Sequence, residues 1–146
     1  MNHHQSRIRR IDKNIPLPEH KTPGAAGFDL SARERMVIAP KTIGYVPLNV
    51  ALEPPSGYFV LLAARSSLHK KGLMCANGIG IVDADYSGNE DEYKAVLFNY
   101  TDTEVVVEEG DRLMQGVFIP YSRVSWDEVD DLGNANRGGF GTTGER

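Results

Sequence analysis

The apolar residues of this chain come in short bursts that are separated by turn-forming residues. The bursts cover residues 36–39, 43–52, 58–64, 95–100, 105–107 and 113–121, and such lengths are typical of strands rather than helices. Pro-Pro-Ser-Gly at residues 54–57 and Glu-Gly-Asp at residues 109–111 supply the backbone angles that chain reversals need. Many short strands with frequent turns predict an all-β fold, either a sandwich, a jelly roll or a barrel.

Three segments depart from the strand pattern. A helix of one or two turns is predicted around residues 66–74, where Ser66 or Ser67 can cap the first backbone N–H groups. Residues 1–10 are too short and unpatterned for a targeting peptide, so we expect a frayed terminus there. Residues 133–144 contain five glycines and almost nothing to bury, so a mobile C-terminal lid is predicted over residues 132–146.

Size and charge limit the functions that the chain can have. A chain of 146 residues with 40% hydrophobic and 25% charged content matches a single globular domain over residues 1–146. The net charge of -4 argues against broad binding to nucleic acid backbones, so any phosphate recognition must be local. The sequence shows no apolar run of membrane-spanning length, and its single cysteine, Cys75, cannot form an internal disulfide. We therefore expect a soluble, cytoplasmic protein without nucleic acid or membrane partners.

Asp83 follows the apolar pair Ile81 and Val82, with Gly78 and Gly80 upstream. Glycines allow a ligand to approach the backbone closely, and the spacing places Asp83 at the end of a tight hairpin. A carboxylate fixed there can accept a proton from water and act as the general base of a hydrolysis. Taken alone, the segment fits an aspartate that only makes a turn equally well.

Three other segments carry groups that suit a phosphorylated ligand. Arg65, Ser66 and Ser67 follow an apolar strand and offer a planar cation and two hydroxyls at a predicted helix start. Gln115 closes the segment Asp-Arg-Leu-Met-Gln, which alone fits a turn and a strand. The last segment places polar and aromatic groups among glycines, namely Arg137, Phe140, Thr142 and Thr143. In isolation each segment also has a purely structural interpretation, as a helix cap, a strand and a disordered terminus.

In chain order, these segments resemble the five motifs of the trimeric dUTPase family. The first motif is similar to Ala-Gly-Phe-Asp-Leu at residues 26–30, the second to Arg-Ser-Ser-Leu at residues 65–68 and the third to residues 77–88. The fourth is similar to residues 110–115 and the fifth to residues 137–144, although the fifth lacks two residues that the family has after its Arg. The resemblance implies a β jelly roll and a homotrimer with active sites at the subunit interfaces.

The resemblance also implies a reaction. The reaction is the hydrolysis of dUTP to dUMP and pyrophosphate, in which Asp83 activates the water that attacks the α-phosphorus while Mg2+ neutralises the triphosphate. It provides a precursor of dTTP and keeps uracil out of DNA. Asn77 and backbone groups near Gly80 would contact uracil, and the ring of Tyr86 would pack under the deoxyribose and exclude a 2′-hydroxyl.

The remaining motif residues have implied roles at the phosphates and in a closing lid. Those that would hold phosphates are Arg65, Ser66, Ser67 and Gln115. In the C-terminal segment, Phe140 would stack on uracil while Arg137, Thr142 and Thr143 close over the γ-phosphate. Asp29 would support the site without binding substrate, and Mg2+ would be held by phosphates and water rather than by a direct protein ligand.

Two other functions stay open at this point. A dCTP deaminase, or a bifunctional deaminase and diphosphatase, shares the fold, but it needs a catalytic Glu in the strand after the third motif. Here that strand reads Lys-Ala-Val-Leu-Phe-Asn at residues 94–99. A nucleotide-sensing regulatory protein would keep the pocket and lose turnover. The acidic run Asn-Glu-Asp-Glu at residues 89–92 lengthens the connection to that strand and is interpreted as a solvated loop.

Overall fold

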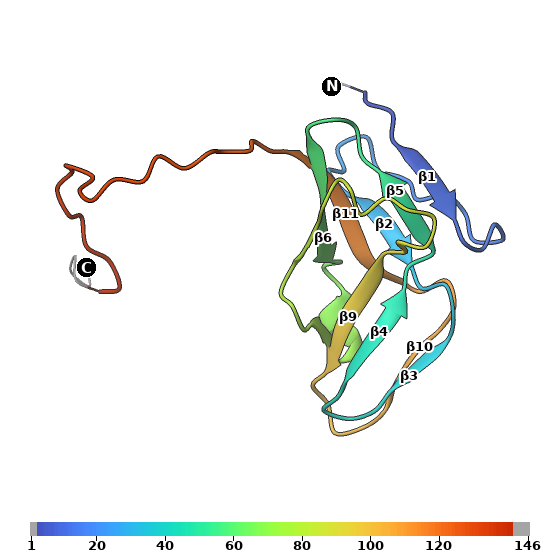
Figure 1. Ribbon diagram of the computed structural model, residues 1–146. Coiled ribbons are helices and arrows are strands. Elements are labelled where there is room, and N and C mark those ends of the chain that lie inside the picture. Colours follow the sequence, from blue (N-terminus) through green and yellow to red (C-terminus); the bar gives the residue numbers. More distant parts are fainter. Residues whose placement is uncertain (1–2, 142–146) are drawn as a thin grey trace.

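The computed structural model describes residues 3–141, and β-strands dominate it (Figure 1). The strands are β1 (Arg7–Arg10), β2 (Phe28–Ser31), β3 (Met36–Ile38), β4 (Ile43–Pro47), β5 (Val50–Glu53), β6 (Tyr58–Ala64), β7 (Leu73–Cys75), β8 (Gly80–Val82), β9 (Lys94–Asn99), β10 (Val105–Val107) and β11 (Arg112–Pro120). A short 3-10 helix, η1 (Leu68–Lys71), lies between β6 and β7. No helix within residues 3–141 is long and apolar enough to cross a membrane. The prediction of an all-β fold is confirmed.

Within the described residues the strands form four antiparallel sheets. β2, β11, β6 and β8 make a four-stranded sheet, and β4, β9 and β7 make a three-stranded sheet. β1 pairs with β5 and β10 pairs with β3, and these two pairs lie at opposite ends of the body in Figure 1. Because neighbouring strands are mostly distant in sequence, the chain crosses repeatedly between sheets, as it does in a jelly roll.

A shared hydrophobic core holds the four sheets together. Along β9 every second residue is buried, so Ala95 and Leu97 point inward with the period of two that a strand imposes. Leu30 of β2, Val50 of β5 and Val107 of β10 join the same cluster and are at most 2% exposed. Each Å² of apolar surface removed from water contributes about 25 cal/mol, so the core is the main stabilising term of the fold.

The chain turns a corner within residues 43–52, which the sequence predicts as one strand. Asn49 has a φ of 72°, a left-handed conformation that Asn tolerates better than most residues. Its buried side chain donates to the carbonyl of Asp12 at 3.0 Å and accepts from the N–H of Asp12 at 2.6 Å. The prediction of a single strand is wrong, because this corner divides it into β4 and β5.

Two predictions about polar segments also need correction. The expected frayed terminus is wrong for Arg7–Arg10, because these residues form β1 and pair with β5 from Arg7 opposite Glu53 to Arg10 opposite Val50. The helix predicted around residues 66–74 is too long, since η1 has four residues and β7 begins at Leu73. Ser67 is the N-cap residue of η1, but within the described chain its side chain makes no capping hydrogen bond.

The chain leaves the body after β11. Residues 121–141 contain no strand or helix, and Figure 1 shows them running away from the sheets. Large apolar side chains in this segment are therefore open to solvent in a single chain, with Trp126 90% exposed and Leu132 82% exposed. Whatever this segment contributes to a site, it does not contribute to the core of its own chain.

We expect Gly116→Ala to lower the free energy of unfolding by about 1–3 kcal/mol through overpacking. A Cβ at Gly116 would lie 2.5 Å from Cζ of Phe28, whose ring packs against Phe118 with the centroids 5.4 Å apart. Equilibrium unfolding in urea measures the change. Gly24→Ala is the matched control, because a Cβ at Gly24 meets nothing within 4 Å. Equal stability of the two variants would contradict this packing argument.

Candidate active site

A cluster of polar side chains, which we call the Arg65 cluster (Asp29, Arg65, Arg112 and Gln115), lies where β2, β11 and β6 run side by side. Asp29 is opposite Gln115, and Gln115 is opposite Ala63. The Asp29 carboxylate accepts a hydrogen bond from Nε of Arg65 at 3.1 Å and another from Nη1 of Arg112 at 3.2 Å. The carboxylate is mostly buried, whereas both guanidinium groups reach solvent.

The Arg65 cluster suits a phosphorylated ligand. Two guanidinium groups share one carboxylate, which leaves an excess of positive charge and free N–H donors for an anion. The Gln115 side chain is fixed, since its Nε2 donates to the carbonyl of Ala64 at 3.1 Å. Gly27, Asp29, Arg65 and Gln115 line one surface depression. Gly27 makes room there, because a Cβ would lie 2.7 Å from Oε1 of Gln115.

Ser66 and Ser67 lie between β6 and η1, directly beyond Arg65. Ser66 is exposed and Ser67 is half-buried. Capping of η1 does not occupy the Ser67 hydroxyl. Both serines therefore extend the polar surface of the Arg65 cluster at the same end of β6.

Asp83 lies in a second depression. β8 pairs with β6, and Asp83 follows β8 directly with an exposed side chain. The depression around it is also lined by Asp85 and Tyr121. The carbonyl of Asp83 accepts the N–H of Tyr86 at 3.1 Å and closes a turn. An exposed carboxylate on a closed turn is well placed to take a proton from a bound water molecule.

Asn77 lies three residues before Gly80, which is the first residue of β8. Asn77 is exposed in the turn after β7, in which the N–H of Gly78 donates to the carbonyl of Cys75 at 3.1 Å. Gly80 begins β8 opposite Leu62. The prediction of a tight hairpin before Asp83 is wrong, because β7 pairs with β9 while β8 pairs with β6. The turn instead carries the chain from one sheet to another.

Asp83 and the Arg65 cluster lie at opposite ends of β6. Val82 is opposite Val60, so Asp83 lies beside the start of β6, whereas Arg65 follows its last residue. With a rise of about 3.3 Å per residue, roughly 20 Å of strand separate the two ends. A general base and the groups that hold a reacting phosphate must meet within a few ångströms. A single chain therefore does not bring these predicted site residues together.

Arg137 and Phe140, two of the C-terminal residues predicted to close the site, line neither depression. Phe140 is fully exposed, with a φ of 52°. Arg137 is exposed too, and its Nε donates to the carbonyl of Gly138 at 3.2 Å. Figure 1 shows this part of the chain far from the sheets. Thr142 and Thr143 lie outside the described residues.

The interpretation of the sequence missed two charged residues. Arg112 stands in the same motif as Gln115, and its position beside a predicted strand was a usable signal. Glu92 gave no such signal, because it belongs to an acidic run. The prediction of a solvated loop over residues 89–92 is wrong for Glu92, which is 9% exposed and accepts hydrogen bonds from Arg33 and from the N–H of Asn49.

Comparison with known proteins identifies the family. The dUTPase family model matches residues 13–144. The chain belongs to the dUTPase family. The deoxyuridine 5'-triphosphate nucleotidohydrolases of Hydrogenobaculum sp. and Desulfitobacterium hafniense are 38% and 40% identical to it over 141 residues. The first alignment covers 94% of this chain and 96% of the relative, and the second covers 92% and 91%.

Solved dUTPase structures share the fold of the chain. The dUTPase of Streptococcus mutans is 38% identical and superposes with a TM-score of 0.75 over 82% of this chain and 98% of that chain. The Staphylococcus bacteriophage 80alpha dUTPase, solved with dUPNHPP, has a TM-score of 0.85 over 98% of this chain and 100% of that chain. Its identity is 22%, so that likeness concerns the fold alone. The resemblance to dUTPases and the jelly-roll-like fold are both confirmed.

Proposed function

We propose that this dUTPase-family chain hydrolyses dUTP to dUMP and pyrophosphate at sites formed between the subunits of a homotrimer. The observation that carries the proposal is the separation of Asp83 from the Arg65 cluster along β6. A neighbouring copy can supply the Arg65 cluster to the subunit that supplies Asp83. In a ring of three copies the same interface, repeated three times, completes all the sites. The names of the relatives support the choice of dUTP as substrate. We place the reaction in the cytoplasm, where it provides a dTTP precursor and keeps uracil out of DNA.

In the proposed mechanism Asp83 is the general base. Its carboxylate accepts a proton from water while the water oxygen attacks the α-phosphorus in line. The bond from the α-phosphorus to the oxygen that bridges to the β-phosphorus breaks, and pyrophosphate leaves with that oxygen. dUMP keeps the oxygen that came from water. Little covalent chemistry involves the protein, so position and charge supply most of the rate acceleration.

The phosphates are proposed to lie against the Arg65 cluster of a neighbouring subunit. Arg65 and Gln115 present N–H donors there, and Ser66 and Ser67 add hydroxyls. Asp29 is a positioning residue, because it holds Arg65 and Arg112 through its two carboxylate oxygens. Arg112 joins the site as a second cation, which the family motif alone did not single out.

Mg2+ is the proposed cofactor. Asp83 and Asp85 bring exposed carboxylate oxygens to one depression, and Mg2+ prefers oxygen ligands while keeping several waters and binding through phosphates. The carboxylates of Asp83 and Asp85 suit an Mg2+ ion whose own ligands are phosphate oxygens and water molecules. When bound, the ion neutralises charge on the triphosphate and on the leaving pyrophosphate. The structure of a mutant of the phage phi11 dUTPase, a relative in fold, shows the coordination of a structural Mg(II) ion.

The nucleoside is proposed to lie along β8 of the subunit that supplies Asp83. Asn77 and the backbone near Gly80 contact uracil, and the Tyr86 ring packs under the deoxyribose. The C-terminal segment closes the site, with Phe140 stacked on uracil and with Arg137, Thr142 and Thr143 over the γ-phosphate. The exposure of most residues from 121 to 141 in a single chain supports this role, because their side chains are available to cover another subunit.

Removal of residues 137–146 is expected to lower kcat/KM for dUTP by about 100-fold, since a closing lid both orders the substrate and excludes water. Urea unfolding should show the same stability as the intact chain, because none of residues 137–141, the described part of this segment, belongs to the hydrophobic core. Glu128→Gln, a change in the same exposed stretch, is the control and should leave activity unchanged. Full activity of the shortened chain would contradict the lid.

A substrate panel tests the proposed function directly. The protein is incubated with Mg2+ and each of dUTP, dCTP, dATP, dGTP, dTTP and UTP, and pyrophosphate, monophosphate and ammonia are measured. Selective formation of dUMP and pyrophosphate from dUTP is expected. Ammonia from dCTP would instead favour the deaminase, and tight dUTP binding without pyrophosphate would favour a nucleotide sensor.

A further inference from the structure

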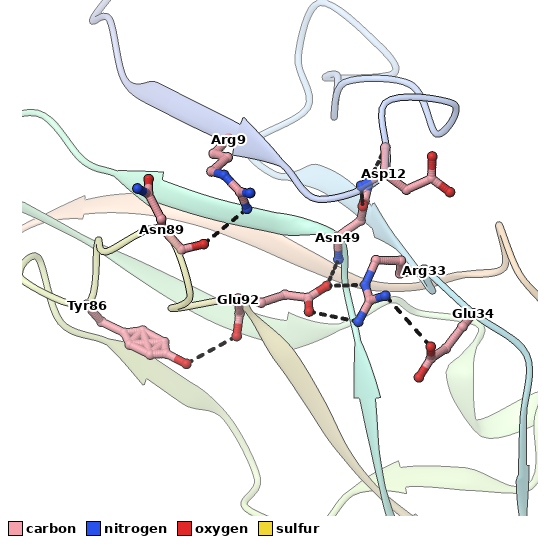
Figure 2. Close-up of polar contacts among 8 residues, drawn as sticks. All are labelled: Arg9, Asp12, Arg33, Glu34, Asn49, Tyr86, Asn89 and Glu92. Atoms are coloured by element: carbon pink, nitrogen blue, oxygen red, sulfur yellow. Dashed lines mark hydrogen bonds and ion pairs between the residues drawn. The ribbon is translucent and has the colours of Figure 1, made fainter.

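Glu92 is the anchored end of the loop that carries Tyr86 (Figure 2). Its Oε2 accepts hydrogen bonds from Nε of Arg33 at 2.8 Å and from the N–H of Asn49 at 2.8 Å, and its Oε1 accepts one from Nη2 of Arg33 at 3.1 Å. The Glu92 side chain is 11% exposed. Two-point contact between a guanidinium group and a carboxylate fixes direction as well as distance. Glu92 is therefore held by three hydrogen bonds from two residues.

Both anchors belong to the rigid body of the fold. Arg33 lies just after β2, and its N–H donates to the carbonyl of Pro47 at 2.9 Å. Asn49 forms the corner between β4 and β5, where its side chain is bound to Asp12. Glu92 thus takes its position from two places in the body, the segment after β2 and the corner between β4 and β5.

The anchored residue in turn holds the Tyr86 ring. The Tyr86 hydroxyl donates to the backbone carbonyl of Glu92 at 3.1 Å, and the ring faces buried Tyr93 with the centroids 6.2 Å apart. At its other end the Tyr86 N–H donates to the carbonyl of Asp83. Between these points Gly88 and Asp91 close a turn, with the N–H of Gly88 donating to Oδ2 of Asp91 at 2.8 Å. The same peptide unit donates the Tyr93 N–H to the carbonyl of Val50 at 2.8 Å. The carbonyl that holds the Tyr86 hydroxyl therefore has two anchors, this backbone hydrogen bond and the ion pair of the Glu92 side chain with Arg33.

A second argument concerns the cost of the ion pair. The Glu92 side chain is mostly removed from water and the Arg33 side chain is 28% exposed. Loss of hydration offsets part of the attraction between the charges, and well-packed apolar side chains often stabilise a fold as well as a buried ion pair does. The pair is thus a poor way to gain stability alone. Compared with an apolar contact, the ion pair also fixes the orientation of the Glu92 side chain. A fixed orientation matters where a neighbouring group must be placed accurately.

We propose that the Arg33–Glu92 ion pair is a positioning device that sets the selectivity for deoxyribose by fixing the Tyr86 ring. The inference rests on the proposed role of Tyr86 under the sugar. The Tyr86 ring excludes a 2′-hydroxyl only if the ring is held in place, because even a small displacement of the ring makes room for part of an oxygen atom. With the pair broken, the Glu92–Tyr93 peptide keeps only its backbone hydrogen bond to Val50 and can tilt about it, so that the Glu92 carbonyl shifts, the Tyr86 ring follows and ribonucleotides gain access.

The test compares Glu92→Gln and Arg33→Lys with the wild-type protein. Gln keeps an acceptor for the Asn49 N–H but loses the charge, and Lys keeps the charge but not the two-point contact. Each variant is expected to lower the ratio of kcat/KM for dUTP to that for UTP by about tenfold, the size of a typical coupling between neighbouring groups. The gain on UTP should dominate, with kcat on dUTP changed less than about threefold. The double variant should match the single ones, because both changes break one pair.

Arg35→Met is the matched control, because it breaks an exposed ion pair, that of Arg35 with Glu108 at 3.5 Å. Its selectivity ratio should equal that of the wild-type protein. A purely structural role for Arg33 and Glu92 would lower the unfolding temperature and both activities without changing the ratio, and that result would overturn the inference.

Tyr86→Ala separates this inference from the proposed function. If Tyr86→Ala lowers the ratio and Glu92→Gln and Arg33→Lys do not, the positioning role is overturned while the role of Tyr86 stands. If Tyr86→Ala leaves the ratio unchanged, the sugar contact itself is wrong, and the inference fails with it. A lower ratio in all three variants, with the Arg35→Met control unchanged, supports the inference.

Discussion

Asp83→Asn is expected to lower kcat on dUTP by roughly 10³-fold while KM stays within about threefold of the wild-type value. The amide has the shape of the carboxylate but takes no proton from water, so both base catalysis and the placement of the water are lost. The turn itself should persist, because it is closed by the backbone carbonyl of Asp83 and the N–H of Tyr86. The rate of pyrophosphate release from dUTP with Mg2+ measures the effect.

Glu90→Gln provides the matched control for this substitution. Glu90 is an exposed carboxylate of the same loop, and its loss should change kcat by less than about twofold, as exposed positions usually do. Both variants should unfold at the wild-type temperature. Near-normal turnover in Asp83→Asn would rule out the general base, and an equal loss in both variants would assign the effect to the loop rather than to the carboxylate.

Strands with a clear turn on each side could be predicted from the sequence. The bursts at residues 58–64 and 105–107 coincide with β6 and β10, because local propensity and turn chemistry agree there. The burst at residues 43–52 contains Asn49, whose left-handed backbone places a corner inside an apolar run. Asn takes this conformation only in some contexts, and here the context is a pair of hydrogen bonds to Asp12. No local pattern contains that information.

The candidate site shows the same division between local and distant information. The order of the motifs indicates the family, because each motif is a short contiguous segment. The hydrogen bond from Arg65 to Asp29 joins residues 36 positions apart, and that from Arg33 to Glu92 joins residues 59 positions apart. Glu92 can be buried because Arg33, its distant partner, neutralises its charge. The sequence of the acidic run alone predicts a solvated loop, because it does not show that Arg33 lies beside it. The separation of Asp83 from Arg65 likewise becomes visible only once the register of β8 against β6 is known.

Mixing two inactive variants is expected to restore activity, because the proposed sites combine halves from different subunits. Asp83→Asn removes the base, and Arg65→Met removes a phosphate contact at the other end of β6. When equal amounts are unfolded together and refolded, about three quarters of the trimers are mixed, and each of these has one site with both residues intact. Roughly a quarter of the wild-type activity should therefore return, although each variant alone has almost none.

The control for this experiment uses two changes within one half of the site. Asp83 and Tyr86 belong to the same turn of one chain, so a mixture of Asp83→Asn with Tyr86→Ala never assembles an intact half. Its activity should not exceed the mean of the two variants measured separately. Restoration by the second mixture but not by the first would contradict the shared site, since it would require Asp83 and Tyr86 to act from different subunits. Restoration by the first mixture alone would mean that one subunit supplies the base and another supplies the phosphate contact, as the roughly 20 Å of β6 between them demands.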